Sequence, residues 1–147
     1  MPKATGSIKF LEDIAIADTA FLVQGKNPAK LFENASTALV KTMADISRIG
    51  QTVSRKITLE SEELDILLFD YLNELLLLKD SENLLFSRFI LDIKKHTNSW
   101  KLTAELIGEK ADPEKHKITI DIKAITMHMF KLKKTQEGYE ARVVVDI

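Results

Sequence analysis

The sequence of 147 residues contains no cysteine. This excludes disulfide frameworks, zinc–thiolate sites, iron–sulfur clusters and thiol nucleophiles. The side chains that remain as metal ligands are three histidines and 22 carboxylates. The carboxylates among them favour hard ions such as Ca²⁺ or Mg²⁺.

Long apolar segments are also missing. No run approaches the roughly 18 apolar residues of a membrane-spanning helix, and the opening MPKATGSIKF lacks the apolar core of a signal peptide. We therefore expect a cytoplasmic protein with no membrane contact.

The 21 Lys and Arg residues nearly balance the 22 Asp and Glu, which gives a formal net charge of −1. This balance argues against a protein that works by non-specific binding to phosphate backbones.

Sequence motifs of common enzymes are absent. There is no GxGxxG, phosphate loop, GxSxG, HExxH or calcium-binding DxDxDG loop. His96 and His116 lie in polar, turn-like segments and are expected at the surface. His128 lies among apolar residues, where a structural role and a partner contact are equally reasonable. No catalytic site is visible, and we expect the protein not to be an enzyme.

Two helices are predicted by apolar residues at three- and four-residue spacing. The first begins with Asn27 as N-cap and Pro28 in the first turn, and it ends near Gly50. The second follows Ser61, whose hydroxyl is expected to cap it. Its apolar stripe consists of Leu64, Leu67, Leu68, Tyr71, Leu72, Leu75 and Leu76, which predicts one buried helix face.

Strands are predicted where apolar and polar residues alternate. These segments are 8–11, 19–23, 51–60, 89–93, 102–106, 118–132 and 141–147, with a hairpin turn at Gln136–Gly138. Strands joined by hairpins and separated by two helices indicate an α+β fold. We expect a single domain over residues 1–147, with two layers: a mostly antiparallel or mixed β-sheet and two main helices packed on one face.

Two isolated carboxylates stand out in strand-like segments. Asp146 lies beside the α-carboxylate of Ile147, and Asp18 is the only charged residue between Asp13 and Lys26. A lone carboxylate of this kind often makes a local hydrogen bond at a strand edge or turn. If the first and last strands are neighbours, however, Asp18, Asp146 and the terminal oxygens would form an oxygen-rich site for a hard divalent cation.

Blocks along the chain resemble the archease family. Phe10-Leu11-Glu12 followed by Ala17-Asp18 and Gly25 is similar to the family's opening FLEHTAD…G pattern, and the segment Leu67–Leu75 is similar to its LLYDWLNEL helix. Further blocks follow in the family's order: 31–45, 84–89, 108–116, 123–128 and the Val-Asp-Ile end. The resemblance covers about residues 8 to 147.

The resemblance implies a protein cofactor rather than a catalyst. A protein of this family is expected to activate the RtcB-type tRNA-splicing RNA ligase by promoting its GTP-dependent guanylylation and multiple turnover. It would contact RNA only indirectly, through the ligase. The resemblance also implies a divalent cation, calcium in the typical case, held by Asp18, Asp146 and a main-chain or terminal oxygen of Ile147.

The opening departs from the family pattern in one respect. Two extra residues lie between Glu12 and Gly25, and we place them before Ala17-Asp18. The family's histidine then corresponds to Ala15, which puts any role of that histidine in doubt. Without this shift, Ile16 would occupy the position of the metal-binding aspartate, and its side chain cannot bind a cation.

Partner contacts are expected near the same end of the molecule. Lys123 and His128 are candidates for contact with the ligase or with phosphate, although Lys123 is equally well explained as a solvated surface lysine. Two other functions stay open. One is a chaperone-like protein-interaction module with a structural metal site, and the other is a metal-dependent hydrolase, which lacks an accompanying base or nucleophile.

Overall fold

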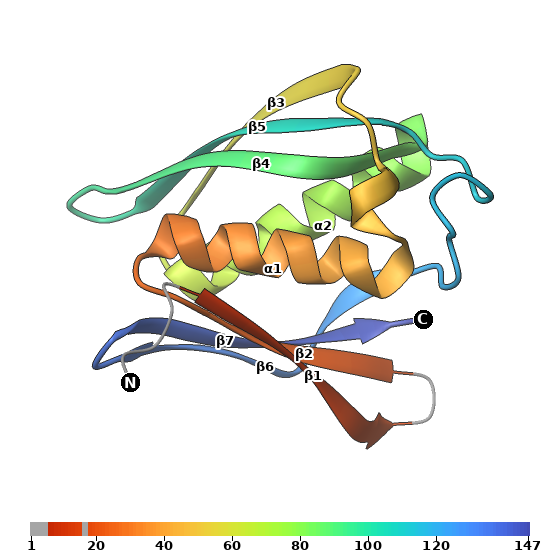
Figure 1. Cartoon of the computed structure of the whole chain (residues 1–147). Helices are drawn as coiled ribbons and strands as arrows, with labels where there is room; N and C mark the ends of the chain where they lie inside the picture. The colour runs from red at the N-terminus through yellow and green to blue at the C-terminus, as the bar shows by residue number, and fades with distance from the viewer. Residues whose placement is uncertain (1–5, 16–17) are drawn as a thin grey trace.

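The computed structural model has two long helices and seven strands (Figure 1). It describes the main chain of residues 6–15 and 18–147, and the side chains of residues 6, 11–15 and 18 lie outside the description. The elements are β1 (Gly6–Ala15), β2 (Asp18–Gly25), α1 (Pro28–Met43), the 3₁₀ helix η1 (Ile46–Arg48), β3 (Val53–Ser61), α2 (Leu64–Glu82), β4 (Leu84–Lys95), β5 (Trp100–Lys110), β6 (Ala124–Thr135) and β7 (Gly138–Asp146). No helix among the described residues is long and apolar enough to cross a membrane.

The strands form two antiparallel sheets, and both helices lie between them (Figure 1). One sheet has the order β1-β2-β7-β6, and the other has the order β3-β5-β4. Helix α1 packs against β2 of the first sheet and β4 of the second, while α2 packs against β6 and β3. The predicted α+β class is confirmed. The arrangement of one sheet with helices on one face is corrected to three layers, sheet–helices–sheet.

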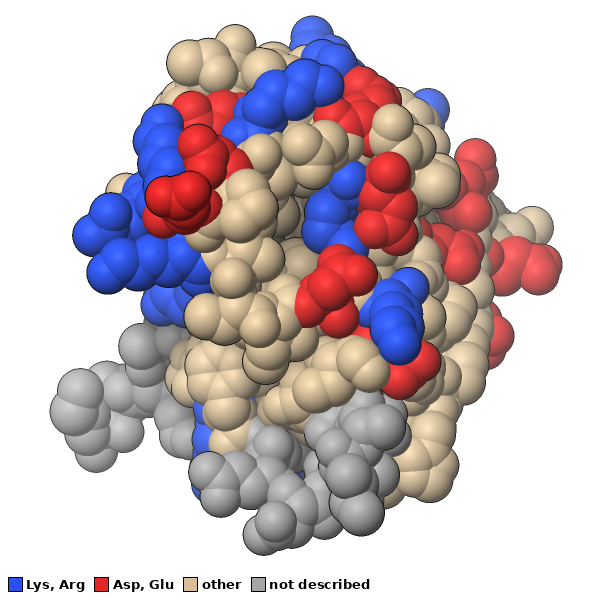
Figure 2. Space-filling model, turned by 90° about the vertical axis from the view of Figure 1, so that its right-hand side faces the viewer, with Lys and Arg blue, Asp and Glu red and all other residues tan. Residues whose placement is uncertain are grey.

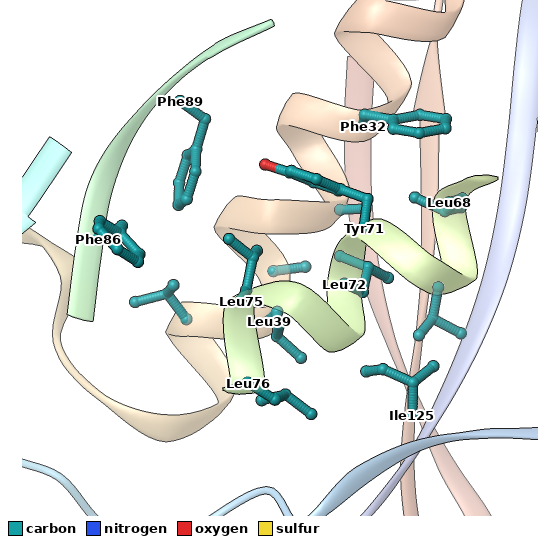
Figure 3. Packing of buried hydrophobic residues seen from close by; sticks show 14 of the residues in the cluster. Phe32, Leu39, Leu68, Tyr71, Leu72, Leu75, Leu76, Phe86, Phe89 and Ile125 are labelled. Atoms are coloured by element: carbon teal, nitrogen blue, oxygen red, sulfur yellow. The ribbon is translucent and has the colours of Figure 1, made fainter. Parts of the chain in front are cut away.

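The three layers follow from helices that are apolar on more than one side. Besides its predicted stripe, α2 carries Phe69, whose ring packs edge-on against Phe130 of β6 at 5.7 Å. Its opposite side buries Tyr71, whose ring stacks on Phe32 of α1 at 5.8 Å (Figure 3). A helix with several apolar faces is stable only when it is covered on several sides. The stripe alone predicted one buried face and missed the second sheet.

The helix ends follow the predicted signals only in part. The Asn27 side chain accepts a hydrogen bond from the Lys30 amide at 2.8 Å, which confirms it as N-cap. Ser61, by contrast, is the last residue of β3, and its hydroxyl accepts from the Glu63 amide at 3.3 Å. Helix α1 ends at Met43, well before Gly50, because Asp45 starts the separate turn η1.

The predicted strand 118–132 is shorter than expected. Residues 111–123 form a loop, and β6 begins at Ala124. The loop alternates in burial like a strand, with Ile122 fully buried, but its main chain is bonded to other elements. The amide of Thr119 donates to the carbonyl of Met43 at 2.9 Å. Alternation therefore identified the buried side chains correctly and the strand boundary wrongly.

Candidate functional site

The register of the four-stranded sheet brings the two predicted metal-binding aspartates together. Asp18 is the first residue of β2 and Asp146 the last residue of β7, and their Cα atoms are direct partners in the β2–β7 ladder. Such partners in an antiparallel ladder lie about 5 Å apart. The side chain of Asp18 belongs to the part outside the description, so the juxtaposition rests on the main chain.

Lys123 and Ile147 lie beside this pair. The Lys123 amide donates to the Asp146 carbonyl at 2.8 Å, which extends the β6–β7 ladder by one bond beyond Ala124, the partner of Asp146. The Lys123 side chain is exposed, whereas Ile147 is half-buried and packs on the core. Three segments distant in sequence thus meet at this end of the sheet, which we call the acidic end, defined by Asp18 and Asp146.

Lys79 of α2 fixes the loop that leads to Lys123. Its ammonium group contacts Asp121, lies 2.8 Å from Asp80 and donates to the Ile122 carbonyl at 3.2 Å. Its side chain is only 11% exposed. Burial alone would lower the pKa of Lys79, but the hydrogen bonds to Asp121 and Asp80 outweigh it and raise the pKa above its usual value. The lysine is therefore a charged structural anchor rather than a base.

His116 contradicts the expectation of a surface histidine, because it is fully buried. Its Nδ1 accepts from the Asp112 amide at 3.0 Å, so Nδ1 carries no proton and the Nε2–H group donates to Glu109 at 2.6 Å. Its carbonyl accepts from the Asp45 amide at 2.8 Å. The polar neighbours that indicated a surface position instead form a turn folded around the ring.

Glu109 of β5 collects three hydrogen bonds in this cluster. It accepts from the Gly50 amide at 2.7 Å and from His116, and Lys115 Nζ lies 2.8 Å from its Oε2 atom. The hydrogen bond from Lys115, with those from Gly50 and His116, lowers the pKa of Glu109 to about 2. The cluster attaches the loop of residues 111–123 to β5 and to the segment after α1. It therefore fixes the start of this loop, and the other end of the loop, at Lys123, lies at the acidic end.

This pKa shift predicts a pH-dependent contribution to stability. A carboxylate with a lowered pKa stabilises the fold above its unfolded pKa of about 4.3, and that contribution is lost as the pH falls through about 2. We expect Glu109→Gln to lower the urea midpoint at neutral pH, with a difference from wild type that shrinks between about pH 4 and pH 2. Exposed Glu62→Gln is the control. A difference independent of pH would contradict this assignment.

His128, the other predicted partner contact, lies in an irregular part of β6. Pairing with β7 shifts between Thr126 and Lys131, and within this bulge Met129 has a positive φ of 57°. The His128 side chain is exposed. The bulge separates it from the regular pairs next to Lys123, so the structure does not combine the two residues into one contact point.

The described surface on this side of the molecule is electrostatically mixed. Figure 2 looks onto the side that lies at the right in Figure 1 and shows both acidic and basic side chains above the residues drawn in grey. Within the described part of the chain, which leaves the Asp18 side chain out, no three His, Asp or Glu side chains group closely enough to hold a metal ion. The described side chains alone therefore do not complete a metal site around Asp146.

Comparisons with known proteins agree on one family. A model of the Archease protein family (MTH1598/TM1083) matches residues 9–147. The chain is 36% identical to the protein archease of Methanosarcina barkeri over 132 residues, covering 89% of this chain and 90% of that protein. It is also 36% identical to the protein archease of Pyrococcus abyssi, covering 89% of this chain and 93% of that protein.

Solved structures share the fold. The solution structure of Methanobacterium thermoautotrophicum protein 1598 matches with a TM-score of 0.83 at 32% identity, covering 95% of this chain and 98% of that one. The crystal structure of an archease from Thermotoga maritima, described as a possible chaperone, matches with a TM-score of 0.57 at 23% identity, covering 90% of this chain and 93% of that one. The second match concerns the fold alone.

Proposed function

Because the chain belongs to the archease family, we propose that it is a protein cofactor of an RtcB-type tRNA-splicing RNA ligase. In this role it promotes GTP-dependent guanylylation of the ligase and allows multiple turnover, and the ligase carries out the chemistry. The observation that carries the proposal is the family match over residues 9–147. A cytoplasmic location follows from this role.

We further propose that a divalent cation, calcium in the first instance, binds at the acidic end. Asp18, Asp146 and a main-chain oxygen of Ile147 would hold it. The direct pairing of Asp18 with Asp146 supports this assignment, since carboxylate and carbonyl oxygens are the ligands that Ca²⁺ prefers. Like charges placed opposite each other in a sheet are unfavourable, and a bound cation would relieve this repulsion.

An activator without catalytic groups acts by binding one state of its partner more tightly than another. We assign the docking contact to the acidic end, with Lys123 beside it and His128 further along β6. Lys123 is held next to Asp146 by its main-chain hydrogen bond, so a lysine side chain and two carboxylates belong to one edge. Such an edge can contact both a phosphate and a basic group near the nucleotide site of the ligase.

The test is a guanylylation assay with the ligase of the same organism and radiolabelled GTP. We expect this protein to increase the rate at which the covalent GMP–ligase forms, and the chelator EGTA to abolish the increase. The ligase alone with EGTA is the control, since it shows any effect of the chelator on the ligase. An unchanged rate with this protein present would contradict the proposal.

The alternative is a chaperone-like protein-interaction module with a structural metal site. Its support is the family itself, one member of which, the Thermotoga maritima archease, is described as a possible chaperone. A protein that leaves guanylylation unchanged but prevents a partly unfolded protein from aggregating would support this alternative.

A further inference from the structure

A row of basic side chains crosses the four-stranded sheet from β1 to β6. In register, the row reads Lys9, Leu22, Arg142 and Lys131. Lys9 and Lys131 are exposed, and Arg142 is half-buried. We propose that this row, which we call the basic row, binds the phosphate backbone of RNA directly. The choice of RNA among polyanions rests on the proposed function.

The basic row lies on the face of the sheet that the helices leave uncovered. Phe21, Val23 and Val143, the residues adjacent to Leu22 and Arg142 along their strands, are fully buried in the core. Because successive side chains in a strand point to opposite faces, Leu22 and Arg142 point outward. Figure 1 shows both helices on the inner side of this sheet, so the helices leave the outer face free at the basic row. Two residues further along the same face, the pair Ala20 and Val144 is fully buried, so the open part of the face is limited to the row and its surroundings.

Arg142 is held in place for such a contact. Its Nε atom donates to the Met129 carbonyl at 2.8 Å, and that carbonyl is presented by the bulge in which Met129 has a φ of 57°. A non-glycine residue in this region costs about 1 kcal/mol or more. Neither terminal nitrogen of Arg142 has a hydrogen-bond partner among the described residues. A guanidinium oriented in this way loses little entropy when it binds phosphate.

A hollow of about 110 Å³ lies over the basic row, lined by Leu22, Lys131, Lys133, Glu140 and Arg142. Glu140 is the one acidic residue among these lining residues, and its carboxylate is already paired with other side chains. It accepts from Gln24 at 3.0 Å and lies 3.5 Å from Lys133. Lys131 and Arg142 thus keep a net positive charge at the hollow.

The outer face of the three-stranded sheet shows that this arrangement is not a general property of the surface. There, Lys56 is the direct partner of Glu105, and Lys101 is the direct partner of Glu60. Lys101 is also the partner of Lys94, which in turn lies 3.8 Å from Asp92. Each of these lysines thus has an acidic neighbour, whereas the basic row contains no acidic residue. Among the described residues, positive charge on this face is therefore more fully compensated by carboxylates than it is in the basic row.

The geometry indicates backbone contacts without base recognition. The basic row contains no aromatic side chain on which a base could stack, so it would contact phosphates whatever the sequence. Asp146 lies four residues beyond Arg142 on β7 and hence on the same face, about 13 Å away. RNA held on the row would therefore lie close to the acidic end, where we place the ligase.

The experiment measures RNA binding by the isolated protein, using fluorescence anisotropy of a labelled transfer-RNA half at several salt concentrations. We expect salt-dependent binding by the wild type. Lys9→Gln with Lys131→Gln should weaken it several-fold and lower the slope of log Kd against log salt by about one for each lysine. Arg142→Lys keeps the positive charge but removes the planar guanidinium group with its paired N–H donors, and it should weaken RNA binding less than the double substitution. Lys56→Gln with Lys101→Gln, the same charge change on the other sheet, should leave it unchanged.

Several results would overturn the inference. The wild type could fail to bind RNA at low salt. Alternatively, the control double variant (Lys56→Gln with Lys101→Gln) could bind RNA as weakly as the row double variant (Lys9→Gln with Lys131→Gln). The row double variant could also keep its RNA affinity but no longer stimulate guanylylation in an assay without RNA. This result would show that the basic row binds an acidic surface of the ligase instead. If the wild type binds RNA through the row but does not stimulate guanylylation, the proposed function fails while the RNA surface stands.

Discussion

Replacing Asp18 or Asp146 by asparagine is expected to abolish the stimulation of ligase guanylylation, with the fold intact. Each substitution removes the carboxylate of one of the two aspartates whose Cα atoms are direct partners in the β2–β7 register. Calcium affinity depends strongly on the number of charged oxygen ligands, so one carboxylate less should leave the site empty at working concentrations. The measurement is the rate of GMP–ligase formation with each variant.

Thermal melting with and without calcium separates loss of the ion from loss of the fold. A ligand at a hundredfold excess over its Kd stabilises a protein by about 2.7 kcal/mol. We expect the Tm of the wild type to rise with calcium and the Tm of both variants to stay constant. In chelator the variants should be at least as stable as the wild type, because a like-charge pair has been removed. Asp92→Asn, exposed on the other sheet, is the matched control. If both variants keep the calcium-dependent rise, the site lies elsewhere.

Gly108→Ala is expected to lower the free energy of unfolding by about 3 kcal/mol or more. Gly108 of β5 pairs with Phe86 at the bulge of β4 and with Val53 on the other side. An added methyl group would run into the Leu85 carbonyl oxygen and would lie 2.6 Å from the Phe86 Cα atom. Both are main-chain atoms of a paired strand, so they cannot move aside without breaking the ladder.

Gly50→Ala is the control for this substitution. Its methyl group would meet only the end of the Glu109 side chain, with the nearest oxygen at 2.9 Å. Glu109 can move aside only by straining its hydrogen bonds to Gly50, His116 and Lys115, but the strand ladder stays intact, so we expect a loss of about 1–2 kcal/mol, smaller than at Gly108. Urea unfolding of both variants gives the comparison. Equal losses would show that the close approach of β4 to Gly108 does not limit the fold.

Local patterns in the sequence predicted the elements whose causes are local. Burial along β3 alternates without interruption from Val53 to Ser61, because one face of that strand packs on the core. Asn27 and Pro28 marked the start of α1 because capping depends on neighbouring residues. Asp18 and Asp146 were selected as isolated charges in apolar segments, and their adjacency was conditional on a strand order that periodicity does not specify.

Features that depend on distant partners were not predicted. The burial of His116 requires Glu109 and the Asp45 amide, and its polar neighbours in sequence pointed to the surface. The one available signal was Asp112, a turn residue four positions earlier whose amide binds the ring. The basic row was missed for the same reason, since Lys9, Lys131 and Arg142 are scattered along a chain whose net charge is close to zero.

The pairing of β2 with β7 has a consequence for how the protein is made. The β1–β2 hairpin leaves the ribosome early, and β7, the strand that completes its ladder, is synthesised after all the other elements. Until then, the open edge of β2 exposes unpaired main-chain groups that can pair with other nascent chains. Asp18 and Asp146 become neighbours only when this ladder closes, so their juxtaposition marks a chain in which β7 has joined the sheet.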